Sequence, residues 1–141
     1  MMDQGYGAII NMGSLAGKLP TPNSAVYSAT KAGVIQFDNV LRMEVADYGV
    51  QVLTVNPGPI DTPFFDKADN NYTYRAHLPK WIFISPEDLA RRIWNNVGYK
   101  TREINVPGYV ACLGWAYQVI PGLGDWAIKK FFDFQQDKKN L

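Results

Sequence analysis

The sequence predicts an α/β fold in which about three parallel strands are flanked by helices. Two short β-branched runs, residues 8–12 and 50–56, stand on either side of a long helical pattern at residues 24–48. A second helical pattern begins at Ser85 and leads to a third run, residues 102–106. Strands that alternate with helices in this way pair in parallel through right-handed crossovers.

Composition narrows the class of protein. The chain has 141 residues, 47% of them apolar and 19% charged, as expected for one folded domain. A net charge of +1 gives no basic field for nucleic acid. Cys112 is the only cysteine and is expected to be buried, and His77 is the only histidine, so we expect no disulfide and no metal site. Without a signal peptide or a membrane-length apolar run, a soluble, cytoplasmic protein is expected.

The first strand is expected at Ala8–Met12, a short apolar run typical of a strand buried on both faces. Small residues follow it directly, over Gly13–Gly17. Because open α/β sheets bind ligands at the carboxyl ends of their strands, this turn is a candidate binding position.

The long helix is expected to begin at Ser24 as its cap and to end before Gly49. Within it, Tyr27 and Lys31 are one turn apart and therefore share a face. An ammonium beside a phenol favours the phenolate, so this tyrosine can give or take a proton. The predicted apolar stripe consists of Val34, Phe37, Leu41, Val45 and Tyr48.

The second strand, Val50–Asn56, is stopped by Pro57–Pro59, and Ile60–Pro63 then continues at the same edge as Ser14. Residues 64–80 have little periodicity and are expected to form a long covering loop.

Ser85 and Pro86 are a strong helix start, and Gly98 is expected to close that helix. Its predicted buried stripe is Leu89, Ala90, Ile93 and Val97. Residues 109–134 are apolar and aromatic, and Pro121–Gly124 should divide them into two helices. We expect them to pack on the domain or on a second subunit. Alternatively, they cover an apolar substrate or make shallow contact with a membrane surface.

Three segments together resemble the short-chain dehydrogenase/reductase family: Ile9–Ser14, Tyr27–Gly33 and Val55–Thr62. The resemblance covers roughly residues 5–108. It implies the C-terminal half of a Rossmann-like doubly wound parallel sheet, with residues 1–108 as a partial catalytic half and 109–141 as an apolar helical extension.

The resemblance implies an NAD(P)-dependent oxidoreductase that interconverts an alcohol and a ketone or aldehyde. Tyr27 resembles the acid/base, and Lys31 the residue that assists it and binds the nicotinamide ribose. Ser14 resembles the donor to the substrate oxygen. The implied cofactor is NADP or NAD, held at its nicotinamide end by Tyr27, Lys31, Pro57, Gly58, Ile60 and Thr62. Implied contacts to a small apolar substrate come from Ser14, Leu15, Phe64 and Phe65.

One departure from the family matters. Its members open with a Gly-rich turn that cradles the pyrophosphate, and no such motif occurs here. The chain therefore resembles a half that starts before the fifth strand, and we expect it to be inactive alone. The exposed edge of its first strand would associate with the missing N-terminal half or in a homo-oligomer.

Two alternatives stay open. The chain is either an active-site half or a non-catalytic remnant that serves as an oligomerisation and interaction module, since the helices at 24–48 and 85–97 resemble the family's usual oligomer surface. Isomerase or dehydratase chemistry is a third reading, although the Asn56–Thr62 segment favours the ordinary reductase form.

Overall fold

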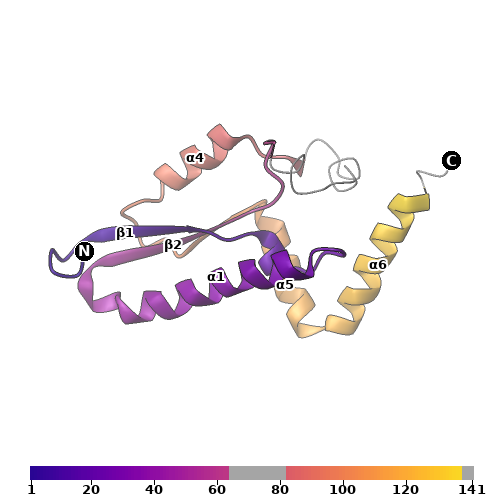
Figure 1. The fold of residues 1–141 in the computed structure, drawn as a ribbon, viewed down its shortest axis with the longest axis horizontal. Coiled ribbons are helices and arrows are strands. Elements are labelled where there is room, and N and C mark those ends of the chain that lie inside the picture. The colour runs from indigo at the N-terminus through magenta and orange to yellow at the C-terminus, as the bar shows by residue number, and fades with distance from the viewer. Residues whose placement is uncertain (64–81, 138–141) are drawn as a thin grey trace.

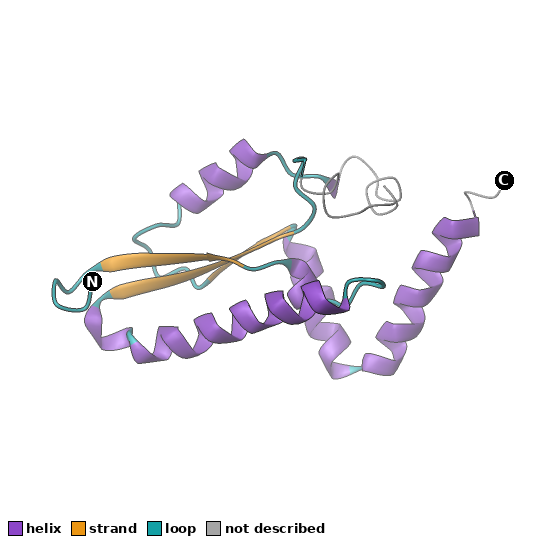
Figure 2. Ribbon diagram, in the orientation of Figure 1, coloured by secondary structure: helices purple, strands orange, loops and turns teal. Residues whose placement is uncertain are grey.

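A computed structural model of the chain describes residues 1–63 and 82–137, arranged as a small sheet with helices on both faces (Figures 1 and 2). In chain order the elements are β1 (Gly7–Met12), the 3-10 turn η1 (Leu15–Gly17), α1 (Ala25–Glu44), the 3-10 turn η2 (Ala46–Tyr48), β2 (Val50–Pro57), α4 (Pro86–Trp94), β3 (Glu103–Val106), α5 (Gly108–Val119) and α6 (Pro121–Asp137).

The sheet has three parallel strands in the order β1-β2-β3, which confirms the predicted fold class. Ile9 is opposite Val52, and Asn56 is opposite Asn105. Helix α1 makes the crossover between β1 and β2. Among the described residues nothing pairs with the outer side of β1, so that strand is an edge.

The two faces of the sheet differ in chemistry. On one face Leu53, Val55, Ile104 and Val106 pack against Leu89 of α4 and form the larger apolar cluster. On the opposite face, under α1, Val45 packs with Val50 and Val52, and farther along the helix the Ile35 side chain lies against Gly13 and Gly17.

Between these apolar contacts lies a polar cluster centred on Asp38, whose exposure is 0%. Its carboxylate accepts from the Asn11 amide at 2.5 Å and from the Thr54 hydroxyl at 2.7 Å. Arg42 donates to Thr54 Oγ1 and to the Val52 carbonyl. Burial and the neighbouring Arg102 lower the pKa of Arg42, and Asp38 opposes that shift. These bonds fix α1 against both β1 and β2.

Helix α1 is shorter than the sequence predicted. It ends at Glu44, and a separate 3-10 turn covers Ala46–Tyr48 before Gly49 adopts φ 66°. Gly49 is thus left-handed as expected but closes η2. Ser24 occupies the N-cap position without making the predicted cap bond, because its hydroxyl bonds Thr21 and Ser28 instead.

The predicted stripe of α1 is wrong at two positions. Phe37 is 58% exposed and Tyr48 is 43% exposed, whereas Asp38 is buried. A stripe chosen by apolarity alone was rotated toward Phe37, because the sheet offers polar partners to α1 at Asn11 and Thr54.

Helix α4 begins as predicted, with the Ser85 hydroxyl accepting from the Asp88 amide at 3.1 Å. It ends at Trp94, four residues before Gly98, which has φ 85°. Leu89 is buried as expected, but Ala90 is exposed. The predicted covering loop at 64–80 lies outside the described residues.

Two helices follow β3, as the sequence predicted, and meet at an acute turn. Helix α5 runs along η1, where Gly114 lies against Lys18, and α6 projects away from the sheet (Figure 1). Cys112 is exposed on α5, which corrects the expectation that it is buried. In the described part of the chain, no helix is long and apolar enough to cross a bilayer.

Candidate active site

Ser14 lies where β1 ends and is only 7% exposed. Its backbone is extended (φ −168°, ψ 153°), and its Oγ accepts from the Ala16 amide at 3.1 Å, which caps the turn η1. A hydroxyl that accepts through one lone pair keeps its proton available for donation. Ser14 is therefore a fixed donor position at the carboxyl end of β1.

Tyr27 and Lys31 lie on the first turns of α1, on one face of the helix. The Lys31 ammonium is 5.8 Å from the centroid of the Tyr27 ring and donates to the Met12 carbonyl at 2.8 Å. Met12 is the last residue of β1, two positions before Ser14. Lys31 therefore connects the tyrosine to the end of the strand that carries the serine. Tyr27 itself is 38% exposed.

The turn η1 rests directly on α1. A Cβ added at Gly17 would lie 2.8 Å from the Ala32 nitrogen and 2.8 Å from the Lys31 carbonyl carbon. Only glycine allows so close an approach of two backbones. This contact sets the spacing between the Ser14 turn and the helix face of Tyr27 and Lys31.

The end of β2 meets the same turn. Pro57 is buried, and the Gly58 amide donates to the Val106 carbonyl at 2.7 Å. A Cβ on Gly58 would lie 3.6 Å from Leu15 Cδ1, so the two strand ends are in contact range. Leu15 is 5% exposed and packs in this junction.

The segment after Gly58 is held by backbone bonds to residue 84. Ile60 forms an isolated parallel bridge with Ile84. The Asp61 amide donates to the Ile84 carbonyl, and the Ile84 amide donates to the Pro59 carbonyl, each at 3.0 Å. Thr62 is half-buried at the end of this segment. Phe64 and Phe65, the predicted substrate contacts, lie outside the described residues.

Sequence reasoning missed a polar chain beneath the Ser14 turn. Asn56, buried on β2, donates to Asn105 Oδ1 at 3.1 Å, and Asn105 donates to Glu103 at 3.2 Å. Glu103 in turn pairs with Lys18, the residue that follows η1. Asn56, Glu103 and Asn105 alternate with buried apolar residues on β2 and β3. That alternation was the sequence signal from which these polar contacts could have been predicted.

The hydrogen bonds that Lys18 and Asn105 make to Glu103 favour its charged form. Burial alone would raise the pKa of Glu103, but hydrogen bonds from Lys18 and Asn105 outweigh it, so this pKa lies below its ordinary value. Asn56 Oδ1 has no partner among the described residues and lies 2.2 Å from the position a Cβ on Gly13 would take. Gly13 therefore allows β1 to pass close to the Asn56 amide.

Together these elements place the Ser14 hydroxyl, the Tyr27 phenol and the Lys31 ammonium near the carboxyl end of β1. That set can donate to an oxygen on which negative charge develops and can transfer a proton to it. Within residues 1–63 and 82–137, no group of three or more His, Cys, Asp or Glu residues could hold a metal ion.

Comparison with known proteins finds similarity to dehydrogenases and reductases. A family model described as short chain dehydrogenase matches residues 1–73. The 2-dehydro-3-deoxy-L-rhamnonate dehydrogenase (NAD(+)) of Sphingomonas sp. is 43% identical over 81 residues, covering 56% of this chain and 32% of its own length. The ketoacyl reductase HetN of Nostoc sp. is 35% identical over 107 residues, covering 75% of this chain and 36% of its own length.

A crystal structure of a variant actinorhodin polyketide ketoreductase with NADPH superposes with a TM-score of 0.67 at 27% identity, covering 79% of this chain and 49% of that one. The chain spans half or less of the length of the relatives it matches. The doubly wound α/β architecture is thus shared with solved relatives over the part that the chain contains.

Proposed function

The chain belongs to the short-chain dehydrogenase family, and on that premise we propose that it carries the catalytic side of an NAD(P)-dependent oxidoreductase. The reaction interconverts an alcohol with a ketone or aldehyde. The single observation that carries the proposal is the position of Lys31, whose ammonium lies between the Tyr27 ring and the end of β1.

In the reducing direction, Ser14 Oγ–H donates to the substrate carbonyl oxygen and holds it. The cofactor, when bound, supplies the hydride that the carbonyl carbon accepts. As the C=O bond becomes single, the oxygen takes the proton of the Tyr27 phenol, and the remaining phenolate is stabilised by the Lys31 ammonium. Each donor is preset, so little reorganisation is needed when charge develops.

The residues at the strand ends fit the nicotinamide end of NADP or NAD. Lys31 has three donor protons and commits one to the Met12 carbonyl, which leaves capacity for ribose hydroxyls. The Thr62 hydroxyl and the backbone around Ile60, ordered by the bridge to Ile84, offer the donors and acceptors that a carboxamide needs. An apolar alcohol or ketone is the substrate class that suits Leu15, Phe64 and Phe65.

The pyrophosphate requires a further element. Because the sequence does not contain the Gly-rich motif with which the family binds the pyrophosphate, we propose that the isolated chain binds dinucleotide weakly or not at all. Titration calorimetry with NADPH and NADH tests this on the chain as it stands. Binding at micromolar affinity would contradict it.

Catalysis is tested in a fusion of this chain to the dinucleotide-binding half of the Nostoc relative, with β1 joined in register. Reduction of a panel of apolar ketones is followed through the consumption of NADPH or NADH. Tyr27→Phe should lower turnover by about 10²- to 10⁴-fold, because it removes the acid. Tyr99→Phe, at an exposed position far along the chain after α4, is the matched control. Equal activity of the Tyr27→Phe fusion and its parent would refute the assignment.

A second function, an interaction module without catalysis, is favoured by the open side of β1. Ile10 and Met12 are about 40% exposed there. Beside Met12 is a shallow, open depression between β1 and α1, lined by Asn11, Met12, Thr30, Gly33, Val34 and Phe37. We propose that a dinucleotide-binding half or a second copy covers this edge. Light scattering that finds a dilution-resistant monomer would count against the second copy.

A further inference from the structure

The turn η1 follows Ser14 directly, and contacts from other elements fix its position. Within the turn the Gly17 amide donates to the Ser14 carbonyl at 3.0 Å, and the Lys18 amide donates to the Leu15 carbonyl at 2.9 Å. A 3-10 helix of three residues makes few such bonds and is weak by itself. After Lys18 the chain enters the loop that leads to α1. The place of the Ser14 hydroxyl therefore depends on what holds the turn from outside.

A polar chain contacts this turn at both of its ends. It consists of Asn56, Asn105, Glu103 and Lys18, linked in that order. At its start, Asn56 Oδ1 lies 2.2 Å from the position a Cβ on Gly13 would take, so the amide rests against the residue before Ser14. At its end, the Glu103 carboxylate accepts from the Lys18 ammonium, just after the turn. The Ser14 segment therefore lies between two contacts of one polar chain.

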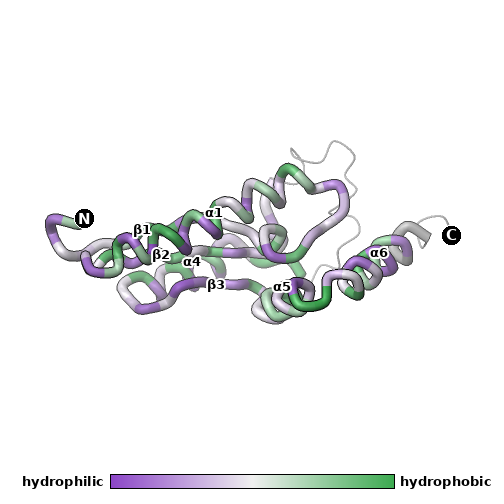
Figure 3. Tube along the Cα trace, turned by 90° about the horizontal axis from the view of Figure 1, so that it is seen from below, coloured by the Kyte–Doolittle hydropathy of each residue, from purple (hydrophilic) through white to green (hydrophobic). Residues whose placement is uncertain are grey.

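Two consecutive elements contact Lys18. Glu103 of β3 pairs with its ammonium, and both side chains are mostly buried, with 19% of Lys18 and 22% of Glu103 exposed. Gly114 of α5 lies against its backbone, since an added Cβ would be 3.1 Å from the Lys18 carbonyl oxygen. Figure 3 shows the polar stretch of chain at β3 leading into the more apolar α5. An ion pair and a close backbone approach thus restrain the same residue.

The burial of this pair separates it from an ordinary surface salt bridge. Exposed ion pairs contribute little, because water screens them and both side chains lose conformational freedom. Here Asn105 also donates to Glu103, at 3.2 Å, and Asn56 donates to Asn105. A carboxylate that Asn105 already holds offers Lys18 a fixed partner, because its own position is set by β2 and β3. The Lys18 ammonium can therefore fix the end of the turn relative to the sheet.

We propose that Lys18 and Glu103 are positioning residues for Ser14. Their ion pair anchors the end of η1 on the sheet, and the bonds within the turn carry that position back to the Ser14 hydroxyl. Gly17 meanwhile rests on α1, the helix that carries Tyr27. The turn is thus fixed to the sheet and to the helix at once, which keeps the serine in a constant place relative to the tyrosine. The catalytic consequence rests on the proposed function, whereas the anchoring itself does not.

Amide hydrogen exchange, followed by nuclear magnetic resonance, tests the anchoring on the full 141-residue chain. The reporters are the amides bonded within the turn, those of Ala16, Gly17, Lys18 and Leu19. In Lys18→Met they should lose about three- to tenfold protection, because the turn loses a hydrogen bond to a charged group. Lys18→Arg keeps the charge and should restore most of that protection. The amides of β2 should stay within about twofold of the parent, since the opening is local.

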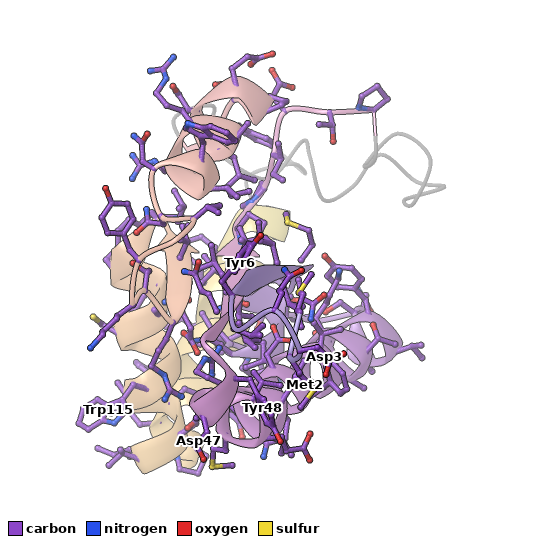
Figure 4. The ribbon with its side chains drawn as sticks, turned by 90° about the vertical axis from the view of Figure 1, so that its left-hand side faces the viewer. Met2, Asp3, Tyr6, Asp47, Tyr48 and Trp115 are labelled. Atoms are coloured by element: carbon purple, nitrogen blue, oxygen red, sulfur yellow. The ribbon has the colours of Figure 1, made fainter. Side chains whose placement is uncertain are left out.

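Three further variants complete this measurement. Glu103→Gln removes the charge of the other member of the pair and should lower the protection of the same four amides. Lys100→Met is the matched control, since Lys100 is exposed in the segment after α4. Figure 4 shows Trp115 extending from α5 away from the sheet, so Trp115→Ala leaves the contact of Gly114 with Lys18 in place. Both controls should keep the turn as protected as it is in the parent.

The effect on catalysis is measured in the fusion described above. Lys18→Met should lower kcat by about tenfold, because displacement of the Ser14 donor weakens an interaction made in the transition state. KM for the cofactor should change by less than about twofold, since Lys18 is not among the residues proposed to hold it. Lys18→Arg should recover most of the loss in kcat, and Lys100→Met should have the kcat of the parent. Circular dichroism confirms that each variant is folded.

Three results would overturn the proposal. The first is protection of the turn that is unchanged in Lys18→Met. The second is a loss of protection that extends equally to β2, because the pair would then stabilise the whole fold and not the turn. The third is an active fusion in which Lys18→Met loosens the turn but leaves kcat unchanged. A fusion without activity, or one unaffected by Tyr27→Phe, would instead count against the proposed function, and the exchange result would then decide the anchoring alone.

Discussion

Two regions of this chain treat polar and apolar side chains in opposite ways. Under α1 the sheet buries Asp38, Thr54 and Asn56 completely, while Phe37 on the same helix faces outward. In the α5–α6 hairpin, side chains such as Trp115 and Ile120 are exposed and little is buried. The buried polar side chains under α1 hold the fold together, whereas the exposed apolar side chains of the hairpin belong to the surface of the protein.

The buried polar face does a specific structural task. Asp38 and Asn56 bond residues on other elements, and Arg42 donates to the Val52 carbonyl on β2 as well as to Asn39 on its own helix. Apolar contacts would permit small slips of α1 along the sheet, whereas these bonds do not. The hairpin has few such bonds, so its surface can change without changing the fold.

The largest change in the free energy of unfolding is expected at Asp38, in the buried polar cluster under α1. Asp38→Ala leaves the Asn11 amide and the Thr54 hydroxyl without their buried acceptor and opens a small cavity. We expect the free energy of unfolding to fall by about 3 kcal/mol. Urea unfolding followed by circular dichroism measures the change, with Asp47→Ala in the exposed turn η2 as the control. A loss no greater than that of the control would show that the polar face is dispensable.

A pair of glycine substitutions comes next. At Gly17 a methyl group would meet the α1 backbone at 2.8 Å, whereas at Gly33 nothing lies within 4 Å. Gly17→Ala should therefore destabilise the protein by about 2 kcal/mol. Gly33→Ala, in the middle of α1, should stabilise it by about 0.5–1 kcal/mol. Changes of the same sign at both positions would refute the close contact of η1 with the helix.

The ion pair of Lys18 with Glu103 predicts a pH dependence. Because the pKa of Glu103 is lower in the folded protein, its contribution to stability is complete above the ordinary value of 4.5 and is lost as pH falls through the folded pKa. Glu103→Gln should cost up to about 1 kcal/mol at neutral pH. The difference from the parent should vanish below that pKa.

Unfolding in urea at a series of pH values measures this convergence. The matched control is Glu87→Gln, an exposed carboxyl in the first turn of α4. A Glu103→Gln deficit that persists unchanged at acid pH would mean that packing of the glutamate, rather than its charge, stabilises the turn.

The smallest effect on stability is expected in the hairpin. Trp115→Ala and Leu123→Ser change side chains that few described residues contact, so each should alter the free energy of unfolding by less than about 0.5 kcal/mol. The same urea experiment measures it. A loss of the size expected for Asp38→Ala would mean that α5 and α6 belong to the folded core after all.

Local signals predicted much of this fold. The β-branched runs marked all three strands, and the serine–proline pair marked the start of α4. These signals were sufficient to place the elements because each of them depends only on residues that are neighbours in the sequence. The end of α1 was misplaced because Val45 continues the helical spacing, although the backbone tightens into a 3-10 turn there.

What the sequence could not predict depends on partners distant in the chain. Asp38 reads as an ordinary surface residue of a helix until β1 and β2 supply Asn11 and Thr54 as donors. The juxtaposition of Lys31 with Tyr27 followed from helical spacing, but its bond to the Met12 carbonyl required the strand to be in place. The roles proposed for Ser14, Tyr27 and Lys31 stay predictions until the fusion is assayed.

The bridge between Ile60 and Ile84 has a consequence for protein engineering. It ties the chain together on both sides of residues 64–81, so the two attachment points keep their places whatever sequence connects them. Changing the length of a connection between fixed points costs little free energy. Segments of other lengths could therefore be grafted between these two points, while the Ser14 turn and the first turns of α1 stay in place.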